Sequence, residues 1–177
     1  MPRQWYVDDA LNLQWVESIS LKATDALPMT HLLALIVKHG SLDAHCLRHP
    51  YTVIVTEGLD SKLERFVVIK ELMHCYFNHE NPAATDSEIL LEAHLRQFFG
   101  KSASTPSAQV TAEYEAFWMA LGVLCPERVR IDWVQRLDAE VEGITVEEIS
   151  DMLHVPVSFV RLLLSDQFED EIRAILN

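Results

Sequence analysis

The sequence is poor in glycine, proline and cysteine, and each shortage excludes a class of protein. Its 177 residues include five glycines and seven prolines, too few for a fibrous or loop-rich chain. The three cysteines are an odd number without a CxxC pair, which argues against a disulfide framework and a cysteine-rich zinc site. Hydrophobic residues make up 49%, so we expect a folded chain with a substantial core.

Long hydrophobic runs and basic residues are also scarce. No apolar run reaches the roughly 20 residues of a membrane helix. The first residues lack the basic start and apolar block of a signal peptide, so we expect a cytoplasmic protein without membrane contact. Lys and Arg number 14 against 27 Asp and Glu, a net charge of −13. This charge makes DNA a poor partner and a basic protein a better one.

Sequence patterns predict an α+β protein that is mostly helical. Residues 8–38 have apolar residues at helical spacing and are predicted to be helical, with a break near Pro28. The run YTVIVTEGLD, residues 51–60, is rich in β-branched and aromatic residues and predicts a strand that turns at Gly58. Further helices are predicted at residues 63–77, 86–99, 111–124, 129–137, 145–166 and 165–177, with a flexible segment at residues 101–109.

The stretch RFVVIKELMH, residues 65–74, differs by one letter from a zinc-peptidase helix with H-E-x-x-H. In that motif two imidazoles four residues apart bind one metal ion, and the glutamate activates the bound water. Glu71 and His74 keep the base and the second ligand, but Lys70 stands at the first ligand position. An ammonium group has no lone pair for a metal. We therefore expect Lys70 to take the place of the metal and to pair with nearby carboxylates.

The surrounding sequence resembles the ImmA/IrrE family of metallopeptidases, which often accompany phage or mobile-element repressors. The family's R-F-T-L-A-H-E-L-G-H aligns with the stretch above, and its E-x-x-A-x-x-F-A-x-x-L-L-M-P aligns with EYEAFWMALGVLCP, residues 113–126. The resemblance covers about residues 50–165. It implies a mostly helical, zincin-like (minimal gluzincin-type) domain with a small sheet at residues 1–130. A C-terminal helical extension, residues 131–177, follows it or joins it in one single domain.

The resemblance assigns the third metal ligand to Glu113. Glu115 is the alternative, but it points about 160° away around the same helix. The implied metal ligands are thus His74 and Glu113, with Glu71 as the general base or its vestige. Because the first ligand is missing, we expect no cofactor, with zinc as the cofactor only if the site still functions.

Lys70 and two further residues of the two motifs are expected to shape the pocket. Lys70, Met73 and Ala116 are predicted to line it. Met73 stands where the family has glycine, and it puts bulk where a substrate or a second helix would pass closely. Ala116 and Ala120 lie one turn apart, so they would let their helix approach the Lys70 helix closely.

Other histidines offer only weak alternatives for a metal site. His79 or His94 would have to join His74 and Glu71, and we interpret both as surface residues. The N-terminal histidines lack ligand spacing; they are His31, His39, His45 and His49. Cys75 faces away from its neighbour His74 and is expected in the core.

The run TVEEISDMLHVPVSFVRLLL, residues 145–164, has the pattern of a helix-turn-helix. Thr145 and Glu148 form a predicted capping box, and Pro156 is expected to start the second helix. That helix offers Ser158 and Arg161 but otherwise apolar residues, whereas a DNA reader needs basic and amide side chains. We therefore interpret this run as a packing or protein-docking module.

Three functions follow from these patterns, and the first is favoured. It is a regulatory pseudopeptidase of the ImmA/IrrE type, associated with a phage or mobile element, that binds a protein partner such as a helix-turn-helix repressor. The second is an active, atypical zinc metallopeptidase that cleaves such a repressor. The third is a non-enzymatic protein-interaction domain. The loss of the first metal ligand at Lys70 favours a chain that is not an enzyme.

Overall fold

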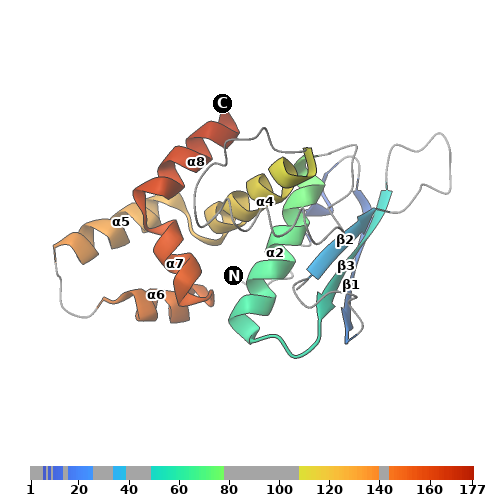
Figure 1. The fold of residues 1–177 in the computed structure, drawn as a ribbon, viewed down its shortest axis with the longest axis horizontal. Helices are drawn as coiled ribbons and strands as arrows, with labels where there is room; N and C mark the ends of the chain where they lie inside the picture. The colour runs from blue at the N-terminus through green and yellow to red at the C-terminus, as the bar shows by residue number, and fades with distance from the viewer. Residues whose placement is uncertain are drawn as a thin grey trace.

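A computed structural model gives the α+β fold expected from the sequence, with helices in the majority (Figure 1). It describes Tyr6, Asp8 and residues 10–13, 16–25, 34–38, 49–77, 108–139 and 144–177. The strands are β1 (Val16–Thr24), β2 (Ala34–Lys38) and β3 (His49–Thr56). The helices are α2 (Ser61–Phe77), α4 (Ala108–Leu124), α5 (Glu127–Asp138), α6 (Val146–Leu153), α7 (Val157–Leu163) and α8 (Asp166–Leu176). Within these ranges no helix is long and apolar enough to cross a membrane.

The three strands form one mixed sheet with β3 at its centre. β1 runs parallel to β3, with Leu21 beside Val53, and β2 runs antiparallel to it. Tyr51, Val53 and Val55 alternate along β3 and are all buried, as expected of a strand with one face on the core. The chain then turns at Gly58, whose φ of +78° suits a residue without a side chain. The predicted strand and turn are therefore confirmed.

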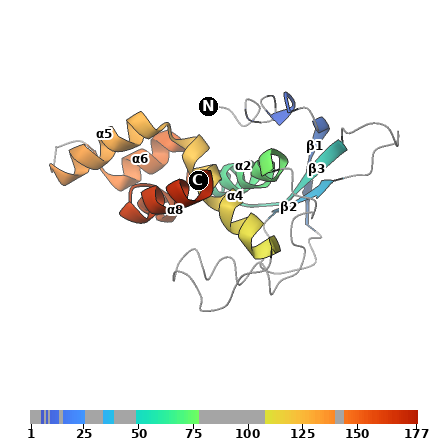
Figure 2. The same ribbon diagram turned by 90° about the horizontal axis from the view of Figure 1, so that it is seen from above.

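Helices α2 and α4 form the middle of the molecule, between the sheet and the C-terminal helices (Figures 1 and 2). α2 packs against β2 and β3 and also against α4. The predicted helix at 63–77 is confirmed, and it is apolar on most sides because it is covered on most sides. The predicted helix at 111–124 is also confirmed, although it begins earlier, at Ala108.

The C-terminal helices pack on the side of α4 away from the sheet. Aromatic rings join three elements: Phe66 of α2 lies 5.2 Å from Phe117 of α4 and 4.3 Å from Phe159 of α7, between ring centroids. Phe168 of α8 is buried in the same core cluster, whereas Leu176 at the end of that helix is 69% exposed. The expected division at residues 130–131 falls inside α5, and the number of domains stays a prediction.

Two basic residues, Arg130 and Lys62, make polar contacts that hold the C-terminal helices in place, and the sequence patterns did not single out either residue. Buried Arg130 of α5 donates to Glu127 at 2.8 Å and to Glu169 of α8 at 2.5 Å, and its guanidinium lies 5.0 Å from the centre of the Phe168 ring. At the start of α2, the ammonium of Lys62 donates to Ser150 of α6 at 2.9 Å. These contacts tie the last helices to one another and to α2.

The turn between α6 and α7 follows the sequence signals. The Thr145 hydroxyl accepts a hydrogen bond from the backbone N–H of Glu148 at 3.1 Å, as the capping box predicts. His154, the residue that follows α6, adopts the left-handed conformation with φ 56°. Pro156 then caps the start of α7, again as predicted.

The helix predicted at residues 8–38 is wrong in two places. Residues 16–24 form β1 and residues 34–38 form β2. Short apolar runs do not distinguish a strand from a buried helix, and here pairing with β3 decides the conformation. The predicted helix at 86–99 lies outside the described residues, as does the flexible segment at 101–109 except for Ala108 and Gln109, which belong to α4.

Candidate functional site

Helices α2 and α4 bring four polar side chains together inside the core. Lys70, Glu71 and His74 come from α2, and Glu113 comes from the first half of α4. Their side chains are 12%, 2%, 7% and 4% exposed, respectively. Charged groups are rarely buried this deeply unless they are paired. We call these four residues the Lys70 cluster.

The ammonium of Lys70 lies between two carboxylates. Its Nζ donates to Oε2 of Glu113 at 2.6 Å and lies 2.7 Å from Oε1 of Glu71. His74 sits on the far side of Glu113, with its Nε2 3.4 Å from the carboxylate Oε1. The residues that sequence analysis assigned to a metal site therefore do converge, and a lysine cation is at their centre.

Burial and attraction act in opposite directions on this ion pair. Burial lowers the pKa of Lys70, but attraction to Glu113 and then to Glu71 outweighs it, so the pKa lies above the ordinary 10.5. Burial likewise raises the pKa of Glu113, but the charge of Lys70 and the nearby His74 outweigh it, so the pKa lies below the ordinary 4.5. Lys70 and Glu113 are therefore both charged at neutral pH.

Two atoms of the cluster have no hydrogen-bond partner among the described residues. They are Oε2 of Glu71 and Nε2 of His74, both fully shielded from solvent; the nearest carboxylate oxygen to Nε2 of His74 in the cluster is Oε1 of Glu113, at 3.4 Å, which is longer than a usual hydrogen bond. Leaving a buried polar atom unpaired costs about 1–3 kcal/mol, and native proteins seldom tolerate it away from functional sites. These two atoms sit on the helical face that would hold the base and second ligand of a zinc peptidase.

The Lys70 cluster does not fit a zinc ion. Catalytic zinc needs three protein ligands with free lone pairs, and only His74 and Glu113 can provide them at the expected positions. The third position holds an ammonium that repels a dication. Within the described ranges, no group of three or more His, Cys, Asp and Glu side chains is arranged to hold a metal ion.

The other residues predicted to shape the pocket lie in the packed interior. Met73 is 2% exposed, and Ala116 and Ala120 are fully buried. Small residues at positions 116 and 120 suit the close packing of α4 against α2. Cys75 is also fully buried, as expected of a core residue.

The alternative metal ligands are Glu115 and histidines whose side chains lie outside the described part of the structure. His79 and His94 lie outside the described residues, as do His31, His39 and His45. His49 begins β3, but only its backbone is described. Glu115, the alternative to Glu113, is half-buried on α4.

Comparisons with family models, curated proteins and solved structures found no match to this chain.

Proposed function

We propose that this chain is a regulatory pseudopeptidase of the ImmA/IrrE type, associated with a phage or mobile element. Its core is a minimal zincin-like domain with a helix-turn-helix-like extension, and the Lys70 ammonium stands where the family holds its metal ion. It acts by binding a protein partner such as a repressor, and it does not cleave that partner. The proposal rests on the sequence resemblance and on the Lys70 cluster.

One observation carries the proposal. Nζ of Lys70 is within 2.7 Å of both Glu71 and Glu113, and His74 adjoins Glu113, all inside the core. A positive charge is needed here because the carboxylates would otherwise be buried without a counterion. A lysine supplies that charge within the chain, so the helix pair keeps its geometry without metal. The same lysine removes the metal-bound water that hydrolysis needs.

A gain-of-metal variant tests this proposal. Lys70→His replaces the cation with the missing imidazole and leaves Glu71, His74 and Glu113 in place. We expect the full-length variant to bind one zinc ion per chain in a calorimetric titration, whereas the unaltered protein binds none. Lys62→His is the matched control, because it also changes a lysine of α2 that is paired with a carboxylate. If Lys70→His bound no zinc, the proposal that Glu71, His74 and Glu113 keep the arrangement of a zinc-peptidase site would be wrong.

The runner-up function, an active metallopeptidase, is favoured by the two unpaired atoms of the cluster. Oε2 of Glu71 and Nε2 of His74 are the groups that a general base and a metal ligand would use. In that case the unaltered protein would cleave its partner and a chelator would stop the cleavage. If cleavage were seen and persisted in Glu71→Gln, the runner-up would also be wrong.

A further inference from the structure

Strand β1 forms an open edge of the sheet. β3 lies on one side of it, and among the described residues no strand lies on the other side (Figure 1). The pairing with β3 is irregular between Val16 and Ser18 and regular beyond Ser18. Along a strand, alternate residues direct their N–H and C=O groups to opposite edges. Half of the backbone groups of residues 18–23 therefore point away from β3, and such an edge is a template for another strand.

One face of β1 continues the apolar face of the sheet. Leu21 stands beside Val53, and Ile19 and Ala23 likewise stand beside buried residues of β3. α2 packs on this face over β2 and β3. Over β1 the cover is incomplete, because Leu21 is 36% exposed, Ala23 is exposed and Ile19 is half-buried. An apolar stripe therefore runs along the open edge.

The opposite face of β1 is polar and carries little charge. Ser18, Ser20 and Lys22 lie on it and are exposed. Proteins protect edge strands from pairing with charged side chains and proline, and residues 18–23 contain a single lysine and no proline. The edge is therefore only lightly protected.

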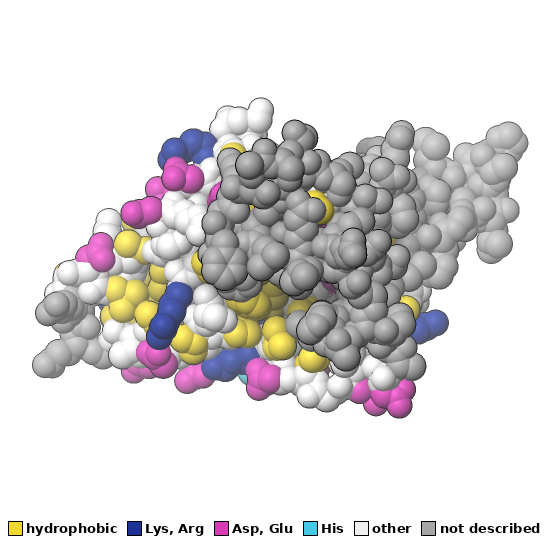
Figure 3. All heavy atoms as spheres, viewed as in Figure 1, with side chains coloured by type: hydrophobic (Ala, Val, Ile, Leu, Met, Phe, Trp, Pro, Cys, Tyr) yellow, Lys and Arg dark blue, Asp and Glu magenta, His cyan; other side chains and the backbone are white. Residues whose placement is uncertain are grey.

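The acidic residues of the chain are concentrated at the other end of the molecule. Residues 127–177 hold 12 of the 27 acids and no lysine. The C-terminal helices pack on the side of α4 away from the sheet. Figure 3 shows Asp and Glu side chains in magenta over these helices, on the left of the molecule. The net charge of −13 therefore opposes an approach of two copies through β1 less than its size suggests.

We infer that β1 pairs antiparallel with β1 of a second copy of this chain, about a two-fold axis at Ser20. Ser20 then faces Ser20 of the second copy, Ile19 faces Leu21, and Ser18 faces Lys22. The two apolar stripes meet on one face of a continuous sheet, and the polar residues meet on the other. This inference does not rest on the proposed function.

The charges around β1 favour this register. With the axis at Lys22, two lysines would face each other directly, which is unfavourable. With the axis at Ser20, they lie about 14 Å apart, beyond the Debye length of about 8 Å at physiological salt. Glu17 and Asp25 are three and five residues from this axis, so each is about 20 Å or more from its copy. An axis before Ser18 would bring the irregular part of the strand to the centre of the pairing.

Sedimentation equilibrium of the full-length protein measures the association. Pairing of two strand edges buries less surface than a standard protein interface, so we expect a dimer that dissociates on dilution, with a Kd of about 1–100 µM. The mass should rise with concentration from the 20.2 kDa of one chain to twice that value. A single-chain mass at concentrations up to ~1 mM would overturn the inference and would leave β1 to a strand of a different protein.

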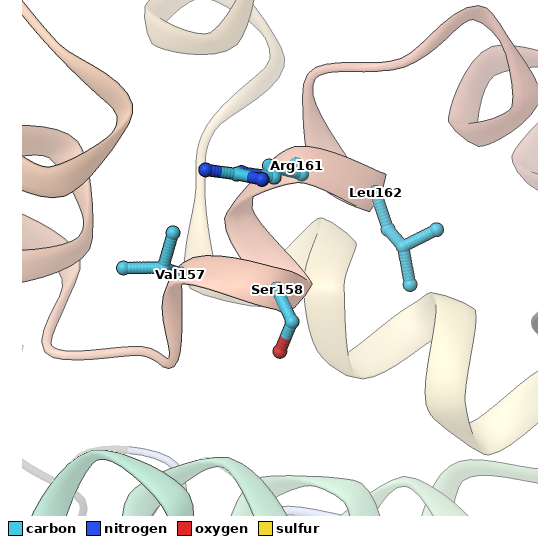
Figure 4. A pocket seen from close by; sticks show the side chains of 4 residues that line it. All are labelled: Val157, Ser158, Arg161 and Leu162. Atoms are coloured by element: carbon cyan, nitrogen blue, oxygen red, sulfur yellow. The ribbon is translucent and has the colours of Figure 1, made fainter.

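Charges placed on the axis test the pairing itself. Ser20→Lys sets two lysines face to face and Ser20→Glu sets two glutamates, so each variant alone should dimerise at least about tenfold more weakly. An equal mixture of the two should associate at least as tightly as the unaltered protein, because a lysine then faces a glutamate. Ser158→Lys is the matched control, since Ser158 is also an exposed serine and lines a shallow depression on α7 (Figure 4).

A further variant tests the register. Ser18→Glu places a carboxylate opposite Lys22 twice in each dimer, so it should tighten dimerisation several-fold. The inference would be wrong if Ser20→Lys dimerised as tightly as Ser158→Lys, if the mixed Ser20 variants stayed as weak as each alone, or if Ser18→Glu weakened dimerisation. Circular dichroism of each variant confirms that a lost dimer is not lost folding. None of these results bears on zinc binding by Lys70→His, so the dimer and the pseudopeptidase proposal can fail separately.

Discussion

Nζ of Lys70 lies 2.6 Å from Oε2 of Glu113, although 43 positions separate the two residues in the chain. This bond joins α2 to α4 at a point where both helices are buried. A buried ion pair contributes little net stability compared with apolar packing, but breaking it by removing one partner is costly. Lys70 and Glu113 therefore depend on each other, because either charge would be buried without a counterion if the other were removed.

Removal of the Lys70 ammonium should destabilise the protein strongly. Lys70→Met keeps most of the side-chain volume but leaves Glu71 and Glu113 buried without their cation. We expect the free energy of unfolding to fall by about 3–5 kcal/mol, measured by urea denaturation. Lys62→Met is the control: it removes an ion pair with Asp151, which is 74% exposed, and one hydrogen bond to Ser150, so the loss there should be smaller, about 1–2 kcal/mol. Equal losses of unfolding free energy in the two variants would show that burial does not make the loss of the Lys70 ion pair more costly than the loss of an exposed one.

Acid should weaken the protein partly through Glu113. The pKa of this carboxyl lies below the ordinary 4.5 in the folded state, so the unfolded chain takes up its proton first. The stabilisation from Glu113 is complete above pH 4.5 and is lost as the pH falls through the lower folded-state pKa. The difference in unfolding free energy between the unaltered protein and Glu113→Gln, measured by urea denaturation, should therefore shrink as the pH falls below 4.5. It should vanish once the pH is below the folded-state pKa of Glu113. A difference that stays constant into strong acid would contradict this assignment.

Alkaline pH tests Lys70, the other member of the ion pair with Glu113. The pKa of Lys70 lies above the ordinary 10.5 in the folded state, so its stabilisation is complete below pH 10.5 and is lost as the pH rises further. The gap in unfolding free energy between the unaltered protein and Lys70→Met should accordingly narrow only above that pH. Narrowing that begins near neutral pH would mean that Lys70 is not held as a cation.

Arg130 should be sensitive to substitution, because it is a buried charged residue that joins two of the C-terminal helices. Its guanidinium is 2% exposed and bonds to Glu127 and Glu169, which are 59% and 51% exposed. Arg130→Ala removes these bonds and the packing over Phe168, and we expect a loss of about 1–3 kcal/mol by thermal denaturation. Glu127→Gln alone should cost less, because solvent screens that partner. If Glu127→Gln lowered the unfolding free energy as much as Arg130→Ala does, the exposed carboxylate of Glu127 would be the main source of the stabilisation by Arg130.

Two cysteines should resist thiol reagents in the native protein. Cys75 and Cys125 are buried, and burial raises their pKa values to about 12 and about 11. The thiolate is the reactive form, so alkylation at neutral pH should be slow at both positions until the chain unfolds. Mass spectrometry of peptides after timed iodoacetamide treatment measures each cysteine separately. Rapid native labelling of Cys75 would contradict its place beside the Lys70 cluster.

The apolar pattern of the sequence was sufficient to predict α2 and α4, and local signals predicted the turn at Gly58 and the cap at Thr145. The two strands before residue 49 were not predictable in the same way. Val16 and Ile19 match a helical spacing, and the run Ala34–Lys38 is apolar without alternation. Their strand conformation depends on hydrogen bonds to β3. A short window of sequence does not reveal pairing between segments that are distant in the chain.

The Lys70 cluster was only partly predictable from sequence. Helical spacing places Glu71 and His74 near one another, but the choice of Glu113 came from the family resemblance. Spacing within α4 does not reveal which of its faces meets α2. The contacts of Arg130 with Glu169 and of Lys62 with Ser150 were not predicted at all, because each joins helices whose relative positions are set by the whole core.

The zinc content of the unaltered, full-length protein tests the central claim most directly. The protein is purified without chelators in zinc-containing medium, and elemental analysis gives the number of zinc ions per chain. We predict far less than one zinc ion per chain, because the Lys70 ammonium stands where a zinc-peptidase helix has its first ligand and repels a dication there. One zinc ion per chain, lost in His74→Ala or Glu113→Gln, would contradict the pseudopeptidase account.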